Sequence, residues 1–364
     1  MKEGTLGALA LALAAAFVLG GARGGPPPVD VARLLADAPA PTLADYHLFS
    51  DAGGRTPNGP ALTPYALNTP LFSDYAQKIR YLFLPPGASV RYSAEGALDF
   101  PVGATLIKTF AYPADFRKPD EKVRFIETRL LIRKAGGWTA LAYVWNDAQS
   151  EAVLKRAGLR VPVGFIDAAG AARAIDYQIP NLNQCKACHA LNGAIVPIGP
   201  KARNLNRDFA YPQGAENQLA HWSRLGLMTG APKPAAAPVL PRWDDPAAPI
   251  EGRARAYLDV NCGHCHNRGG LASNSGMYLT FDEADPAALG VGKRPVAAGR
   301  GSGGLAVSIA PGHPERSILV YRMAATEPGI MMPQIGRSVV HREGLEVVRA
   351  YIAGLRAATP ATSP

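Results

Sequence analysis

Apolar and polar residues alternate along much of the chain between residues 61 and 180, and turn-forming residues separate the alternating runs. A period of two is typical of half-buried strands in an antiparallel sheet. Lys134–Gly137 and Asp167–Gly170 lie between neighbouring runs and predict hairpin turns. The pattern therefore predicts a mainly antiparallel β domain over residues 61–180, with strands at Ser89–Tyr92, Thr105–Phe110, Val123–Ile132, Trp138–Trp145, Val161–Ile166 and Ala174–Ile179.

Helical periodicity is confined to shorter segments. Residues 254–258 place Ala254, Tyr257 and Leu258 on one helical face that leads into Cys262. A second amphipathic helix is expected around Leu345–Leu355 near the end of the chain. Short helices are also expected at Val29–Ala36, Glu151–Ala157 and Asn217–Leu227.

The N-terminus and the charge indicate an exported protein. Met1–Ala22 combines a basic Lys2, an apolar run and small residues, which is typical of a secretory signal, and no other segment is apolar enough to span a bilayer. We therefore expect a periplasmic protein with no transmembrane segment in its mature chain. The net charge of +9 favours an acidic redox partner or a membrane-bound respiratory complex, and no basic, aromatic-rich motif indicates nucleic acid.

The pattern C-x-x-C-H occurs twice, and the two copies contain all four cysteines of the chain. It is the pattern of c-type haem attachment, in which two thiols form thioethers to the porphyrin and the adjacent histidine ligates the iron. The residues predicted to hold two covalently attached haem c groups are Cys185, Cys188 and His189 in the first copy and Cys262, Cys265 and His266 in the second. A zinc site of four thiolates is an open alternative, whereas a thioredoxin-like site would need a βαβ context that the pattern does not predict. We expect His264 to be a solvated spacer.

The C-terminal part resembles class I cytochrome c through the helix into Cys262–His266, the Met332-Pro333 pair and the closing helix. The resemblance implies an all-α domain with His266 as proximal and Met332 as distal ligand. Met331 is the nearest rival, Met277 and Met323 are expected in the core, and His313 at the surface. No proline soon after His266 supplies the carbonyl that often orients the proximal imidazole.

The distal ligand of the first haem is left open. The candidates are Met228, His221 and an unligated face toward the β domain, and Pro197 or Pro200 could lie where a carbonyl orients His189. Residues 99–108, which end at Lys108, are similar to a motif of the cytochrome P460 family. That resemblance implies a lysine bonded to the porphyrin and an open distal site that reacts with small nitrogen compounds.

As a whole, the chain resembles periplasmic di-haem c-type cytochromes with a β-rich N-terminal half, through residues 200–208 and 331–337. Arg203 and Arg207 could pair with haem propionates. We expect a multidomain α+β fold composed of a signal peptide (1–22), an irregular tether (23–60), the β-rich domain (61–180), a first haem-binding segment (181–240) and an all-α class I-like cytochrome c domain (241–358).

This organisation favours single-electron transfer between redox partners over catalysis. Two alternatives stay open. One is a di-haem oxidase or peroxidase, or a P460-like oxidation of hydroxylamine, at an open first haem. The other is a docking subunit that drains electrons from a dehydrogenase.

Overall fold

The computed structural model describes residues 26–356, so the predicted signal peptide Met1–Ala22 lies outside the described residues. Its centre is a six-stranded antiparallel sheet in the order β1-β2-β4-β5-β6-β7. The strands are β1 (Leu62–Pro64), β2 (Gln77–Phe83), β4 (Thr105–Tyr112), β5 (Arg124–Lys134), β6 (Gly137–Trp145) and β7 (Ala152–Leu154). The sheet therefore confirms the antiparallel β structure that the alternating pattern predicts.

Three strands of the sheet, β1, β2 and β7, were not predicted. At β2, Lys78 and Arg80 interrupt the apolar residues with long basic side chains. The short helix predicted at Glu151–Ala157 is wrong, because residues 152–154 pair with β6 as β7. The hairpin between β5 and β6 closes as predicted, with Lys134 opposite Gly137, a glycine at a φ of 132°.

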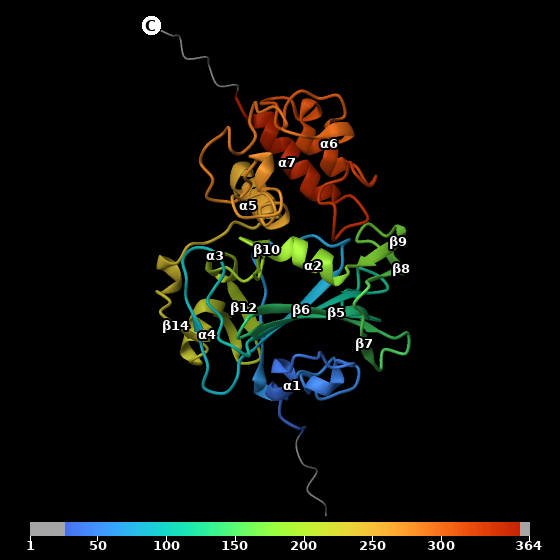
Figure 1. The fold of residues 1–364 in the computed structure, drawn as a ribbon, viewed down its shortest axis with the longest axis vertical. Helices are drawn as coiled ribbons and strands as arrows, with labels where there is room; N and C mark the ends of the chain where they lie inside the picture. Colours follow the sequence, from blue (N-terminus) through green and yellow to red (C-terminus); the bar gives the residue numbers. More distant parts are fainter. Residues whose placement is uncertain (1–25, 357–364) are drawn as a thin grey trace, which may run out of the picture.

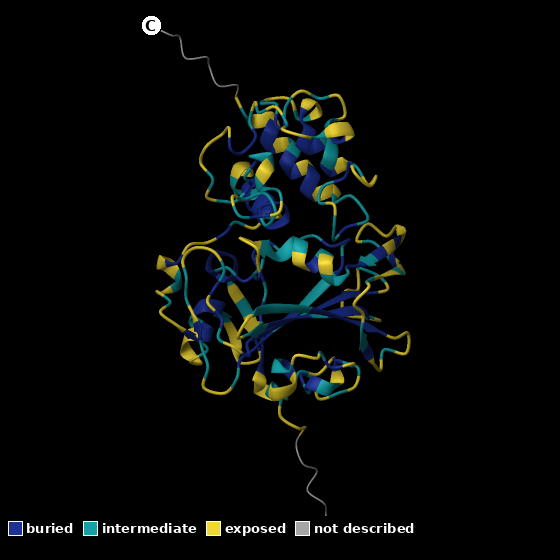
Figure 2. Ribbon diagram, viewed as in Figure 1, coloured by how far each residue is buried: buried dark blue, intermediate teal, exposed yellow. Residues whose placement is uncertain are grey.

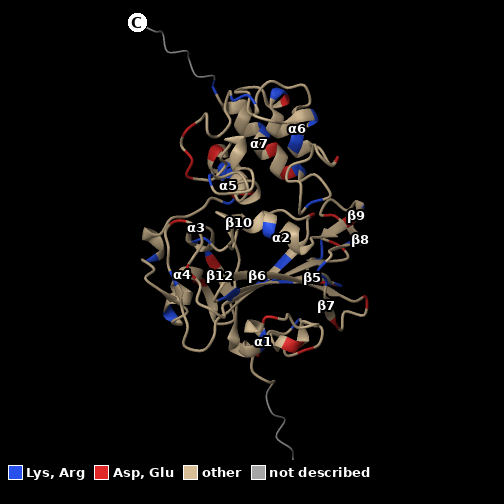
Figure 3. Ribbon diagram, viewed as in Figure 1, with Lys and Arg blue, Asp and Glu red and all other residues tan. Residues whose placement is uncertain are grey.

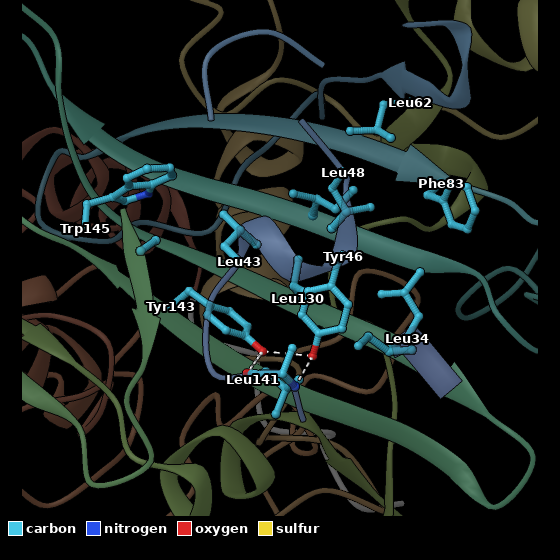
Figure 4. Packing of buried hydrophobic residues seen from close by; sticks show 14 of the residues in the cluster. Leu34, Leu43, Tyr46, Leu48, Leu62, Phe83, Leu130, Leu141, Tyr143 and Trp145 are labelled. Atoms are coloured by element: carbon cyan, nitrogen blue, oxygen red, sulfur yellow. Dashed lines mark hydrogen bonds between the residues drawn. The ribbon is translucent and has the colours of Figure 1, made fainter. Parts of the chain in front are cut away.

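The N-terminal segment covers one face of the sheet (Figure 1). It includes α1 (Val31–Leu35), and Leu34, Leu48 and Tyr46 are almost fully buried against the sheet (Figure 4). The Tyr46 hydroxyl lies 2.9 Å from that of Tyr143 on β6. Residues 26–60 are largely irregular, as expected, but they form part of the core and are not a free tether.

The opposite face carries the first cysteine motif. The hairpin of β8 (Leu159–Ile166) and β9 (Ala172–Ile179) leads into α2 (Leu182–His189), which lies above the sheet in Figure 1. Smaller elements pack beside it and complete this half of the molecule: β3 (Val90–Arg91), β10 (Ala190–Leu191), β11 (Ala194–Ile195), α3 (Ala202–Leu205), β12 (Asp208–Tyr211), β13 (Gly214–Asn217), α4 (Gln218–Arg224) and β14 (Met228–Thr229). Burial is deepest in the central strands (Figure 2).

The C-terminal part does not form the all-α class I cytochrome c domain that we expected. The helices α5 (Ile250–Asn261) and α7 (Arg342–Gly354) occur where their periodicity predicts, and α6 (Ile318–Ala324) adds a third helix. Within residues 241–356, however, the long stretch between α5 and α6 has only short 3₁₀ turns and isolated bridges such as Val291 to Ile309. This stretch is rich in Gly and Pro, which disfavour continued helix. The molecule is a mixed α/β protein.

The C-terminal part is joined to the sheet-bearing half by buried polar contacts. Asp74, in the loop before β2, is 1% exposed and accepts hydrogen bonds from the Ser338 N–H (2.7 Å), the Ser338 hydroxyl (2.9 Å) and the Val339 N–H (3.0 Å). Nearby, the Phe72 ring stacks on His341 at 4.1 Å. In addition, the Lys201 ammonium lies 3.2 Å from the carboxylate of Asp259, a buried residue on α5. Within residues 26–356, no helix is both long and apolar enough to cross a bilayer.

We predict that Asp74→Ala lowers the free energy of unfolding by about 3 kcal/mol, because buried N–H groups at Ser338 and Val339 lose a charged acceptor. Asp74→Asn is the matched control: it keeps one carbonyl acceptor and tolerates the positive φ of 49° at this position. We expect Asp74→Asn to lower the free energy of unfolding by about half as much as Asp74→Ala does. Urea unfolding measures both losses, and equal stability of Asp74→Ala and the native chain would show that the contact does not hold the halves together.

Candidate haem sites

The first motif lies within a short, well-capped helix. Asn181 accepts a hydrogen bond from the Gln184 N–H, and the Gln184 side chain accepts one from the Asn181 N–H. This reciprocal capping box begins α2 three residues before Cys185. At the end of α2, His189 Nδ1 lies 2.7 Å from the carbonyl oxygen of Val196. The orienting carbonyl therefore belongs to Val196 and not to Pro197 or Pro200.

The second motif begins where α5 ends. Cys262 is the C-terminal cap of α5, and its N–H bonds the Leu258 carbonyl. His266 Nδ1 lies 3.2 Å from the carbonyl oxygen of Met277, eleven residues along the chain. A backbone carbonyl thus orients this imidazole although no proline supplies it.

Both motif histidines are in the form that binds a metal. A carbonyl oxygen can only accept, so Nδ1 must carry the proton and Nε2 keeps a free lone pair. Burial lowers the pKa of His189 to about 3 and also lowers the pKa of His266, which keeps both rings neutral near pH 7. Orientation of a ligating imidazole by a backbone carbonyl is the usual arrangement at metal sites.

The four cysteines are unpaired, and their surroundings disfavour the other chemistries. Burial raises the pKa of Cys188 and Cys262 to about 12, whereas a thioredoxin-like thiol has a lowered pKa. Among residues 26–356, no three or more His, Cys, Asp or Glu side chains converge as metal ligands.

The first motif opens into a cavity between the sheet and the C-terminal part. Cys185, Cys188 and His189 line one part of it. Its sheet wall carries four basic side chains: Lys78, Arg80, Lys108 and Arg129. The remaining wall comes from the loop before β2 and from C-terminal residues that include Tyr257, Arg337 and His341. Burial, together with the charges of Arg129 and Arg80, lowers the pKa of Lys108 to about 7.

The second motif opens into an adjoining cavity. Cys262, Cys265 and His266 line it with apolar residues of the C-terminal part, such as Leu279 and Ile318. The empty space, counted with the openings to solvent, is about 1530 Å³ in the first cavity and about 1460 Å³ in the second. The residues that line both cavities are Cys188, Asn261, Cys262, His264, Met323, Met332, Pro333 and Ile335.

His264 is not the solvated spacer that we expected. It is only partly exposed, it lines both cavities, and its Nδ1 lies 3.3 Å from the Val260 carbonyl. Its Nε2 is therefore also free to accept or ligate. The sequence could not indicate this, because it follows from the packing of one motif against the other.

The methionines differ clearly in their positions. Met332 and Met323 line both cavities, whereas Met331 is buried outside them. Met277 lines the second cavity, but its carbonyl lies on the His266 side. The backbone at Met332 is held on two sides: its N–H bonds the Arg322 carbonyl at 3.0 Å, and its carbonyl accepts from Arg337 Nη2 at 2.8 Å.

Several predicted residues lie away from both cavities. Met228 is buried in a hydrophobic cluster away from the cavities. The His221 ring stacks on the Tyr211 ring, and its Nδ1 lies 2.6 Å from the Glu216 carboxylate. His313 is at the surface beside Glu315, as expected. None of the three lines either cavity.

The two arginines that we expected near propionates have other partners. Arg203 pairs with Asp282 at 2.6 Å, and Arg207 donates to the Leu67 carbonyl. The Lys and Arg side chains that line the first cavity are instead Lys78, Arg80, Lys108, Arg129 and Arg337, and Arg322 lines the second. Of these, only Lys108 was singled out from the sequence, since the strand that carries Lys78 and Arg80 was missed.

No family model, no curated protein and no solved structure matches the chain. The case for a cofactor therefore depends on the residues themselves. Each motif has two free thiols beside a neutral histidine that a backbone carbonyl orients, and each lines a cavity. These features fit covalently attached haem at both motifs.

Proposed function

We propose that the protein is a di-haem c-type cytochrome that transfers single electrons between redox partners in the periplasm. When bound, haem iron supplies a centre that gains and loses one electron. The residues that would hold the two haems are Cys185, Cys188 and His189 at the first site, and Cys262, Cys265, His266 and Met332 at the second.

One observation carries the proposal: the two motifs open into cavities with a common wall. Cys188 of the first motif and Cys262 of the second both line the two cavities. Sites this close need no intermediate carrier between them. The buried contacts of Asp74 with Ser338 and of Lys201 with Asp259 hold the two motifs at a fixed distance and orientation.

The thioether sulfur of Met332 is a soft donor, which favours ferrous iron and raises the reduction potential. Arg337 and the Arg322 carbonyl hold the backbone of this residue, so its side chain is presented from a fixed segment. The net charge of +9 supports an acidic redox partner or a membrane-bound respiratory complex.

A di-haem oxidase or peroxidase is the second candidate. Its support is the sheet wall of the first cavity, where the polar residues are Lys and Arg and neither His nor Met occurs. Lys108, the residue similar to the P460 lysine, is one of them. Such a wall leaves space for a small substrate beside the first haem.

We predict that Met332→Ala abolishes the near-infrared sulfur-to-iron band and lowers the potential of the second haem, because the soft ligand is removed. Met331→Ala is the matched control, since Met331 is buried but lines neither cavity. Absorption spectra of both variants measure the band, and redox titration measures the potential of the second haem. Retention of the band in Met332→Ala would assign the ligand to another side chain, with Met323 the next candidate.

The function itself is tested by adding cyanide, nitric oxide or peroxide to the oxidised holoprotein. An electron carrier predicts two low-spin haems with unchanged absorption and EPR spectra, and two reversible one-electron steps. A high-spin first haem that responds to these ligands contradicts the carrier and supports the oxidase or peroxidase.

A further inference from the structure

The basic residues of the first cavity form an ordered group on one face of the sheet. Arg80 on β2, Lys108 on β4 and Arg129 on β5 are direct partners in the strand register, so they make one row across three strands. Lys78 lies two residues before Arg80 and therefore on the same face. Basic positions in this region are visible beneath α2 in Figure 3.

Within residues 26–356, Arg129 is the one of these four basic side chains that forms an ion pair with an acidic residue. Glu127 is fully buried and bonds Arg129 at 2.5 Å, and the Tyr177 hydroxyl donates to the same carboxylate at 2.8 Å. Asp74, the other acid near Lys78, is engaged by Ser338 and Val339.

Among the described residues, Lys78, Arg80 and Lys108 have no acidic partner in an ion pair, and burial lowers the pKa of all three. Lys78 donates to its own strand at the Ala76 carbonyl, 3.3 Å away, and Arg80 donates to the Lys78 carbonyl at 3.2 Å. The ammonium groups of Lys78 and Lys108 approach the Phe110 ring at 6.0 and 5.0 Å. Carbonyls and a ring face offer partial charges only, so none of the three side chains has a full negative charge beside it.

Without an anion, the two lysines of this group lose protons, whereas a bound anion stabilises the fully charged form of all three side chains. Withdrawing an unpaired ion from water costs several kcal/mol even after the protein relaxes, and like charges side by side add repulsion. The three side chains nevertheless face a cavity and not bulk solvent, since all line its wall and Arg80 is 9% exposed. Converging cations around an enclosed space are the arrangement that binds carboxylate or other oxyanion groups.

We propose that Lys78, Arg80 and Lys108 form an anion site in the first cavity that binds carboxylate or small oxyanion groups. Two sources share this chemistry: the propionates of a haem held by Cys185 and Cys188, which rests on the proposed function, and a free oxyanion that enters beside it. Arg129 positions the row from one side while it neutralises Glu127. Arg203 and Arg207 take no part, because their partners lie elsewhere.

The test uses Lys78→Met and Arg80→Met in the holoprotein. Arg133→Met is the matched control, since Arg133 is a basic residue on β5 that does not line the cavity. If propionates occupy the site, each cavity variant lowers the potential of the first haem and leaves the second unchanged, because a positive charge that favours reduction is lost. The control moves neither potential.

If a free oxyanion occupies the site, inorganic phosphate or nitrite raises the melting temperature of the native protein in a saturable way. Each cavity variant then needs about tenfold or more anion for the same rise, because one charge-assisted hydrogen bond is lost. This measurement does not depend on haem, so its failure is separable from failure of the proposed function.

The proposal is overturned if Lys78→Met and Arg80→Met fold, keep the first-haem potential and respond to anions as the native protein does. If either variant fails to fold, Lys78→Arg is measured in its place. This variant keeps the positive charge, so it must keep either the potential of the first haem or the rise of the melting temperature with anion. Loss of both in Lys78→Arg, with the fold intact, also overturns the proposal.

Discussion

The docking of the C-terminal part onto the loop before β2 is the contact on which the rest of the structure depends. Asp74 and Phe72 in this loop hold Ser338 and His341, and the segment that starts at Met332 is thereby placed over the open face of the sheet. Without this contact, the first cavity would lose one of its walls and the second cavity would lose its neighbour. The buried carboxylate is therefore a structural requirement for bringing the two cysteine motifs together.

Local features of the sequence predicted local features of the structure well. The alternating runs became β4, β5, β6, β8 and β9, and the periodic segments became α4, α5 and α7. The motif histidines were identified from spacing alone, because their chemistry needs only neighbouring residues. In each of these cases the signal and the structure lie within about ten residues of one another.

The features that were missed depend on contacts between distant segments. The class I domain was wrong because two correctly placed helices do not determine what the glycine-rich chain between them does. The composition of residues 26–60 is typical of a tether, but their few apolar side chains pack against the sheet. His264 was expected to be a solvated spacer, and Lys78 was not singled out at all; the approach of the two halves places both residues at a cavity.

The two cavities differ in their basic side chains. The first has Lys78, Arg80, Lys108 and Arg129 on its sheet wall, whereas Arg322 lines the second, and Met323 and Met332 line both. In the proposed di-haem cytochrome, a cation beside the first haem and a soft ligand at the second would both favour reduced iron. The two motif histidines, in contrast, are held in the same way by backbone carbonyls, which marks a shared role despite different folds around them.

The account as a whole requires that each C-x-x-C-H motif carries its own thioether-bound haem. Intact mass spectrometry of the mature protein, purified from a host that matures c-type cytochromes, measures this directly. We expect a mass gain of two haems, reduced to one when Cys185 and Cys188 are both replaced by Ala or when Cys262 and Cys265 are. A native protein with no such gain, or one in which a single pair of cysteines carries all the haem, would contradict the account.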